Sequence, residues 1–186
     1  MMQLLSLNRS LPQTIHLKGQ TFTTGIYKTP AAGRIRLHTL GLEGDGQADL
    51  RVHGGVDKAV YLYPHEHYAY WQQTLGRTDL TPGQFGENFT VSGLLETEVH
   101  QGDVFCVGSA VIQITEPRYP CFKLAIKMER RDFPKLFLRS EFSGFYARVR
   151  EEGEAGAGDP IERLTHFPEN PTIQALVHET RKKRIL

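Results

Sequence analysis

Short β-like runs, closely separated by glycine and proline, constrain the fold of this chain more than any other feature. Up to about residue 40 they cover residues 2–7, 14–17, 21–27 and 34–40, with Pro12, Gly19, Pro30 and Gly33 between them. Further runs of this kind are 59–63, 89–91, 103–107, 109–115, 142–150 and 161–164. Runs of this length bounded by turn residues are typical of strands. The sequence therefore predicts a mostly β protein.

Several helices complete the predicted α+β class. Pro64 opens the first, over 64–75, where His67, Trp71 and Leu75 share one face and are expected to pack in the core. The others are predicted at about 120–128, about 131–139 and from Asn170 onward. A chain of 186 residues suits one domain. We expect a core domain over 1–165 and a short helical tail over 166–186.

Composition excludes some classes of function. Twenty-two basic and 21 acidic residues leave a net charge of +1, so the whole molecule has no charge excess that favours nucleic acid or a membrane surface. No apolar stretch approaches 18 residues, and the first residues lack the pattern of a signal peptide. Two cysteines, Cys106 and Cys121, form no disulfide framework. These features predict a soluble cytoplasmic protein, with a local anion pocket still open.

The segment EPRYPCFKL, residues 116–124, places a thiol among prolines and cations. Pro120 suits the first position of a helix, so Cys121 is predicted as the second helical residue. The positive end of the helix, Arg118 and Lys123 would then lower the thiol pKa and favour the reactive thiolate. The alternative is a small buried apolar residue, because free cysteines are often buried.

Two glycine-containing loops carry further candidates. The loop 41–55 ends in His53, Gly54 and Gly55, where backbone N–H groups could approach a ligand and the imidazole could exchange a proton. The loop 81–88 ends in Glu87 and Asn88, and the Asn88 carboxamide could read a polar ring. In each loop the alternative is a side chain that only stabilises a turn.

Charged residues near these motifs allow two interpretations. Glu43, Asp45 and Asp49 could form a general-base or cation cluster, although carboxylates in such loops are more often turn formers and caps. The cations Arg51, Lys58, Arg118 and Lys123 could line an anion pocket or be scattered surface charges.

The ordered set of motifs resembles the MOSC domain family, named for the C-terminal domain of molybdenum cofactor sulfurases. The similarity is carried by GLEGDGQADLRVHGGVDKAVYLYPHEHYAYW, FGENFTVSG and GDVFCVGSAVIQITEPRYPCFKL, which follow one another in the family's order. It is strongest to small stand-alone bacterial members of the YiiM type. The resemblance implies a β-rich fold around a distorted barrel and a cleft for the pterin-based molybdenum cofactor, rather than pyridoxal phosphate.

The resemblance also implies roles for individual residues. The residue that matches Cys121 is the family's invariant site residue, which ligates molybdenum in reductase members and carries sulfur in others. Asn88 matches a contact to the pterin. Further cofactor or phosphate contacts are expected from His53, Gly54, Gly55, Lys58, Arg118 and Lys123.

These expectations give two hypotheses for function. In the first, the protein is a molybdenum-dependent reductase of small N-hydroxylated bases or amines, with Cys121 as the metal ligand and His53 or Glu87 supplying protons. No cysteine pattern for an iron–sulfur cluster is present, so electrons would come from a separate partner. In the second, the protein is a non-catalytic carrier that holds the cofactor or a persulfide on Cys121. The oligomeric state, with a homodimer as one option, is left open.

Overall fold

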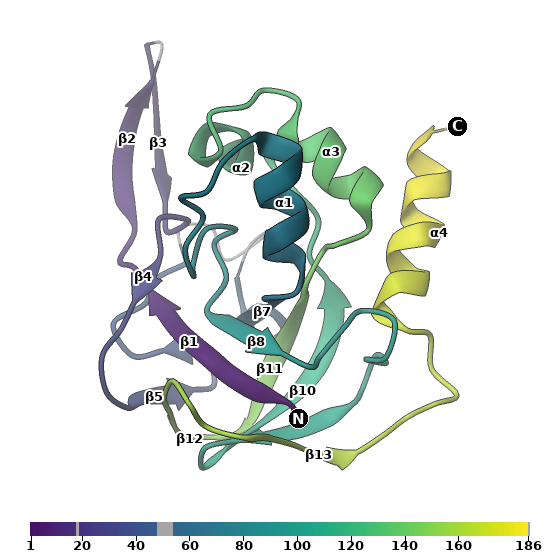
Figure 1. Cartoon of the computed structure of the whole chain (residues 1–186). Helices are drawn as coiled ribbons and strands as arrows, with labels where there is room; N and C mark the ends of the chain where they lie inside the picture. Colours follow the sequence, from purple (N-terminus) through teal and green to yellow (C-terminus); the bar gives the residue numbers. More distant parts are fainter. Residues whose placement is uncertain (18, 48–53, 186) are drawn as a thin grey trace.

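The computed structural model describes residues 1–17, 19–47 and 54–185, with side chains up to Lys183 (Figure 1). Its main element is a sheet in the order β13-β9-β10-β11-β7-β8-β1-β4. The strands in sequence order are β1 (Gln3–Arg9), β4 (Thr29–Pro30), β7 (Val60–Pro64), β8 (Phe89–Ser92), β9 (Val104–Val107), β10 (Ala110–Pro117), β11 (Phe145–Glu151) and β13 (Ile161–Thr165).

Smaller elements surround this sheet. A second sheet has the order β12-β5-β6, and β2 pairs with β3 in a separate hairpin. The bounds of these strands are β2 (Gln13–Leu17), β3 (Gln20–Thr24), β5 (Ile35–His38), β6 (Gly41–Leu42) and β12 (Gly153–Ala155). The helices are the 3-10 turn η1 (Val56–Lys58), α1 (His67–Leu75), α2 (Phe122–Lys127), α3 (Phe133–Ser140) and α4 (Ile173–Ile185).

The eight-stranded sheet curls strongly without closing. Its ladders are antiparallel except for the parallel pair β7–β8. The start of β1 approaches the start of β13, because Leu4 N donates to Asp159 O at 2.9 Å and Ile161 N donates to Met2 O at 3.0 Å. Among the described strands, however, β4 and β13 remain the ends of the sheet. The α+β class is confirmed, whereas a closed barrel is not.

Strand β7 separates two apolar cores. All five of its residues are buried. Val60 and Leu62 belong to the core enclosed by the strands. Tyr61 and Tyr63 point to the opposite face, as strand alternation requires, and join an aromatic cluster with α1, α2 and α3. The predicted burial of the α1 face is confirmed, since Trp71 is fully buried in this cluster.

Two predicted helix starts, at Pro64 and Pro120, were wrong. The first helix begins at His67, because Pro64 is still the last residue of β7. Helix α2 begins at Phe122, and Cys121 is its N-cap, with an extended φ of −124° and ψ of 174°. Pro120 therefore lies before the helix. The segment 151–160, between the runs predicted at 142–150 and 161–164, contains a further strand, because Gly153–Ala155 forms β12 and pairs with β5. Its glycines permit tight packing, since a Cβ on Gly153 would lie 2.5 Å from the Ser109 backbone.

The predicted C-terminal tail contains α4. Its residues Ile173 and Val177 are buried, and Ile173 belongs to the core enclosed by the strands. The helix thus packs on the preceding residues rather than projecting from them. None of the helices in the described ranges is long and apolar enough to span a membrane.

Candidate functional site

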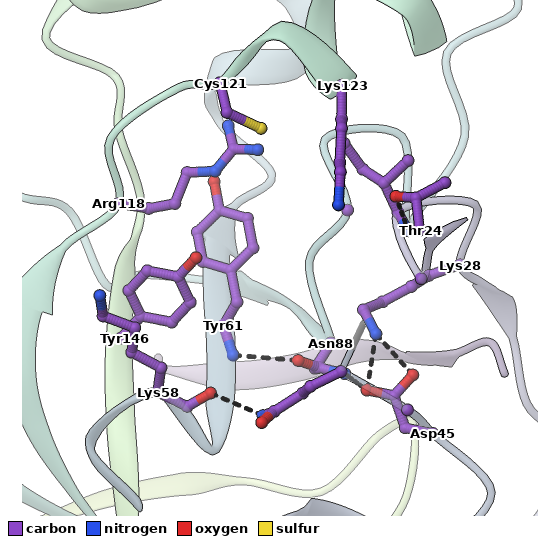
Figure 2. Close-up of a pocket in the computed structure, with 15 residues that line it drawn as sticks. Thr24, Lys28, Asp45, Lys58, Tyr61, Asn88, Arg118, Cys121, Lys123 and Tyr146 are labelled. Atoms are coloured by element: carbon purple, nitrogen blue, oxygen red, sulfur yellow. Dashed lines mark hydrogen bonds and ion pairs between the residues drawn. The ribbon is translucent and has the colours of Figure 1, made fainter. Parts of the chain in front are cut away.

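A pocket opens where three loops meet the ends of β7, β10 and β11, next to the start of α2 (Figure 2). It contains about 630 Å³ of empty space, part of which is open to solvent. The side chains that line it include four cations and one carboxylate. The lining residues are Thr24, Gly25, Ile26, Lys28, Asp45, Gly46, Gln47, Lys58, Tyr61, Gly86, Asn88, Arg118, Cys121, Lys123 and Tyr146.

Cys121 reaches this pocket because β10 ends four residues earlier. The chain leaves the strand at Pro117 and turns into α2, which the fully buried Leu124 anchors in the aromatic cluster. Leu124 N donates to Cys121 O at 3.1 Å and closes the first turn. Cys121 forms no disulfide, and its side chain is partly exposed at the pocket wall. The expectation of a fully buried cysteine is not met.

Arg118 is a buried cation beside this thiol (Figure 2). It is only 5% exposed, and its guanidinium carbon lies 5.4 Å from the Tyr61 ring centroid and 5.2 Å from that of Phe137. Its Nη1 is buried and has no hydrogen-bond partner. Burial lowers the pKa of Arg118, but Tyr61, Tyr146 and Cys121 raise it and the net shift is upward. The pocket therefore keeps a positive charge with unused donor capacity next to a thiol.

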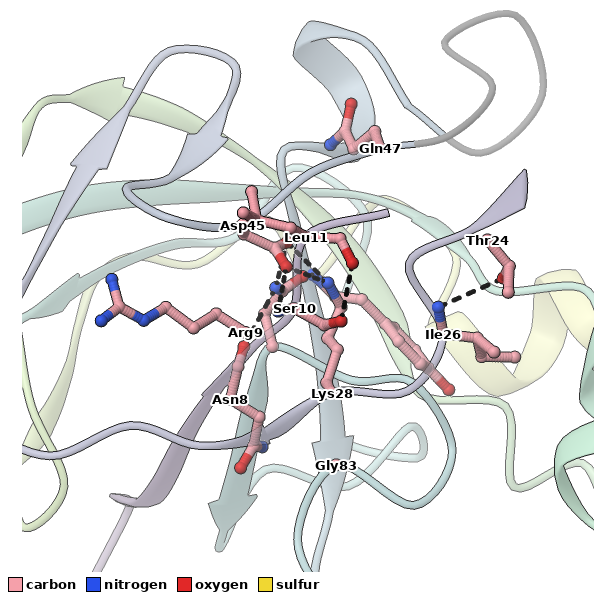
Figure 3. A network of polar contacts seen from close by, with 12 residues as sticks. Asn8, Arg9, Ser10, Leu11, Thr24, Ile26, Lys28, Asp45, Gln47 and Gly83 are labelled. Carbon is pink, nitrogen blue, oxygen red and sulfur yellow. Dashed lines mark hydrogen bonds and ion pairs between the residues drawn. The ribbon is translucent and has the colours of Figure 1, made fainter. Parts of the chain in front are cut away.

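The floor of the pocket holds a buried ion pair (Figure 3). Lys28 Nζ donates to Asp45 Oδ1 at 2.5 Å and to Oδ2 at 2.6 Å, and the two side chains are 8% and 6% exposed. Asp45 also accepts from Ser10 N at 2.8 Å. Burial lowers the pKa of Lys28, although Asp45 opposes this shift. The proton on Lys28 Nζ, at the pocket floor, is therefore easier to release than the proton of an exposed lysine.

Asn88 connects this floor to β7. Its Nδ2 donates to Asp45 Oδ2 at 2.8 Å, and its Oδ1 accepts from Tyr61 N at 3.1 Å. Both ends of the carboxamide are therefore engaged by the protein. Asn88 lines the pocket as predicted, but its hydrogen bonds show a role in positioning Asp45 and Tyr61.

Lys58 and Lys123 extend from opposite sides of the pocket. Lys58 Nζ lies 3.6 Å from Glu116 Oε1 and 5.7 Å from the Tyr146 ring centroid. Lys123 Nζ donates to Thr23 O at 2.9 Å. Together with Lys28 and Arg118, these cations give the pocket a positive field that the near-neutral net charge of the chain conceals.

The glycine triplet of the first loop is only partly described. His53 lies outside the described residues, as do Asp49 and Arg51, so their predicted roles stay predictions. Gly54 and Gly55 are not among the residues that line the pocket. Gly55 has a φ of 92° and donates its N–H to Gln47 Oε1 at 3.0 Å. Because Gln47 lines the pocket, Gly55 supports the wall indirectly.

Glu87 lies behind the pocket rather than in it. Its side chain is fully buried, and its oxygens accept from Gly83 N at 2.8 Å, Phe85 N at 3.0 Å and Thr90 Oγ1 at 2.9 Å. It also accepts from the Tyr68 hydroxyl. This carboxylate organises the 81–88 loop, and the geometry does not favour the predicted role as a proton donor.

Sequence reasoning missed three residues of the site. Lys28, Tyr61 and Tyr146 line the pocket, but none of them was assigned a role from the sequence, although Tyr61 lies within the first segment that resembles the family. For the tyrosines a signal was present. Tyr61 alternates with Val60 and Leu62, and Tyr146 alternates with Phe145 and Ala147, so each tyrosine must face the second side of its strand. Lys28 carried no comparable signal.

The sequence model of the MOSC domain matches residues 49–162. The YflK protein of Bacillus subtilis is 45% identical over 170 residues, which cover 91% of this chain and 76% of YflK. A protein of Gibberella moniliformis named "Reductase" is 32% identical over 149 residues, which cover 78% of this chain and 26% of that protein.

Solved structures show the same relationship. The crystal structure of YiiM from Geobacillus stearothermophilus superimposes with a TM-score of 0.80 at 35% identity, covering 99% of this chain and 86% of YiiM. The MOSC match itself includes Cys121, Arg118, Asn88 and Lys58. This chain therefore belongs to the MOSC domain family and resembles its stand-alone bacterial members of the YiiM type.

Proposed function

We propose that the protein binds the molybdenum cofactor in this pocket, with Cys121 as metal ligand, and reduces N-hydroxylated bases or amines. The MOSC family is associated with molybdenum cofactor binding. The observation that carries the proposal is the position of the Cys121 thiol and the buried Arg118, whose Nη1 has no hydrogen-bond partner, in the lining of one pocket. A relative named as a reductase supports the redox class.

The donor set suits this group. A thiolate is the ligand that soft metal centres prefer, and Cys121 presents its sulfur at the pocket wall. Phosphate groups pair best with guanidinium and ammonium donors, which Arg118, Lys58 and Lys123 provide. When bound, the cofactor would supply two-electron redox chemistry. The protein would supply the ligand, the orientation and the protons.

Proton delivery falls to groups that the pocket contains. Reductive cleavage of an N–O bond takes up two electrons and two protons and releases an amine and water. One proton would come from Lys28 Nζ, which lines the pocket and whose pKa burial lowers, and the second from water, because the pocket is partly open to solvent. Asp45 would stabilise the charged form before the proton leaves and orient Nζ throughout. The electrons would come from a separate electron-transfer partner.

The test is expression in a host that makes the cofactor and in an isogenic host that does not. Molybdenum content is measured on both proteins, and reduction of N-hydroxylaminopurine is assayed with a chemical electron donor. Roughly stoichiometric metal and turnover are expected only from the competent host. Absence of bound molybdenum there would end the enzyme proposal.

Two cysteine variants make this test specific. Cys121→Ser should lose the metal and the activity, whereas Cys106→Ser should keep both, because Cys106 lies in β9 and not among the residues that line the pocket. Equal metal retention by both variants would show that Cys121 is not the ligand. A sulfur adduct on Cys121 without turnover, found by mass spectrometry, would favour the carrier function instead.

A further inference from the structure

The hairpin β2–β3 stands apart from both sheets and projects beside α2 (Figure 1). Its register places Ile15 opposite Phe22 and Gln13 opposite Thr24. Residues directly opposite in an antiparallel pair share a face, and the side-chain period along each strand is two. Ile15, Leu17, Phe22 and Thr24 therefore share one face, which also carries Gln13 and Gln20 at its two ends. The other face is polar and consists of Thr14, His16, Thr21 and Thr23.

The apolar face of the hairpin is turned toward the pocket. Thr24 lines the pocket and is 2% exposed, and Phe22 lies two residues before it on the same face. Ile15 and Phe22 are half-buried, although Gln13, Leu17 and Gln20 on the same face are exposed, and all four residues of the polar face are exposed. Phe22 is not itself among the residues that line the pocket, but the face that it shares with Thr24 places it beside the pocket.

Two consecutive residues after the thiol meet this hairpin. The ring of Phe122 lies edge-on to that of Phe22, with centroids 5.5 Å apart. Lys123 Nζ donates to Thr23 O at 2.9 Å. Phe122 directly follows Cys121, yet it is 58% exposed. The residue that follows Cys121 therefore keeps a large aromatic side chain at the surface.

The aromatic pair differs in chemistry from the pocket beneath it. Cations on the walls and floor can bind anionic groups, but they offer no selectivity for a neutral ring. Aromatic side chains can provide this selectivity, because a planar heterocycle stacks on an aromatic ring whatever substituents the heterocycle carries. A two-stranded hairpin outside a sheet is also only marginally stable alone, so Phe22 can adjust to a ring that contacts it.

We propose that Phe22 and Phe122 form an aromatic lip that contacts the ring of a planar N-hydroxylated substrate and selects it over small aliphatic hydroxylamines. This inference rests on the proposed reductase function and names the substrate class of the same pocket. The lip acts on substrate binding, so its loss should raise KM for planar substrates and leave kcat largely unchanged.

The experiment compares Phe22→Ala, Phe122→Ala and the control Thr14→Val in the cofactor-loaded protein. Thr14 lies on the polar face of the hairpin, outside the pocket, and valine keeps its shape and strand propensity. Stacking on an aromatic side chain is worth about 1–3 kcal/mol, so each alanine should raise KM for N-hydroxylaminopurine by about tenfold. KM for N-methylhydroxylamine should stay within about twofold. Thr14→Val should match the parent for both substrates.

A second measurement separates this inference from the reductase function. Equilibrium dialysis of adenine, the expected product ring, reports binding without turnover. Phe122 is mostly exposed, so Phe122→Ala should fold normally and still weaken adenine binding. If the parent protein reduces neither substrate, the reductase proposal fails. Equilibrium dialysis of adenine then tests by itself whether Phe22 and Phe122 contact a planar ring. The aromatic-lip proposal would be overturned if the alanine variants changed KM equally for both substrates, or if neither variant weakened adenine binding.

Discussion

Two buried charges near the pocket differ in how completely the protein satisfies them. Glu87 is fully buried, and its two oxygens accept from Tyr68, Gly83, Phe85 and Thr90. Burial raises the pKa of Tyr68 and Glu87 raises it further, so this hydroxyl remains a donor. Arg118 is almost as buried, yet its Nη1 has no partner.

The difference separates a structural charge from a functional one. Buried polar atoms in proteins normally have a hydrogen-bond partner, because a buried polar atom without one costs about 1–3 kcal/mol of stability. Glu87 follows this rule and stabilises its loop. Arg118 does not, and its unused donor lies in the pocket beside Cys121. The comparison predicts that Glu87 variants lose stability, whereas Arg118 variants lose binding.

The largest effect on stability is expected for Glu87→Ala. The substitution leaves three buried donors without an acceptor and Tyr68 with only the more distant Thr81 O, at 3.3 Å, so the free energy of unfolding should fall by about 3–5 kcal/mol. Urea unfolding followed by circular dichroism measures it. Glu87→Gln, which keeps the shape and one acceptor, should cost less. If Glu87→Ala lowers the free energy of unfolding by less than about 1 kcal/mol, Glu87 is not the structural charge that the comparison with Arg118 requires.

Lys28→Met should cause the second largest loss in the free energy of unfolding. It leaves the Asp45 carboxylate buried without its cation, although Ser10 and Asn88 still donate to it. Unpairing a buried ion pair typically costs about 3 kcal/mol. The matched double variant Lys28→Met with Asp45→Asn should recover part of this loss in urea unfolding. No recovery would indicate that the Lys28 side chain stabilises through packing rather than charge.

Lys127 should give a smaller, pH-dependent effect that links the two regions. Its Nζ donates to Ile26 O at 2.8 Å on the pocket side and to Gly83 O at 2.5 Å on the Glu87 side. Burial lowers the pKa of Lys127 to about 8. In the unfolded state the lysine pKa is near 10.5. As the pH rises above 8, Lys127 therefore loses its proton in the native state first. Stability contributed by this group therefore rises with pH from about 8 toward 10.5.

The expected gain is about 1 kcal/mol between pH 7 and pH 9. It is measured as the difference between the parent and Lys127→Met in urea unfolding at both pH values, which cancels the titration of other groups. A parent that loses stability relative to Lys127→Met over this interval would show that the native lysine keeps its proton.

Arg118→Leu should have the smallest effect on stability and a large one on the site. Its guanidinium contacts with Tyr61 and Phe137 are lost, but so is an unpaired buried charge, so the net change should stay within about 1 kcal/mol. Alkylation of Cys121 by iodoacetamide at neutral pH, followed by peptide mass spectrometry, should slow because the thiolate loses a neighbouring cation. Cys106 in the same digest serves as the internal control. An unchanged rate would mean that Arg118 does not act on the thiol.

Much of the site could be predicted from the sequence. Cys121, Arg118 and Lys123 lie within six residues, and Lys58 and Asn88 belong to motifs of recognisable chemistry; all five line the same pocket, and their roles stay predictions. Glu87 shows the limit of this reasoning. It is adjacent to Asn88, but adjacent residues at the entry to a strand face opposite ways, and one enters the pocket while the other is buried behind it.

The sequence by itself determined the α+β class, the approximate place of most strands, the family and the thiol at the centre of the candidate site. These depend on local patterns: alternation, turn residues and short motifs. Only the tertiary structure decided that the sheet stays open, that Lys28 pairs with Asp45 under the pocket, and that the β2–β3 hairpin meets Phe122. Each of these depends on contacts between segments distant in sequence. Such contacts form only when burial of the two cores brings the segments together, and no local pattern encodes which atoms then remain unpaired.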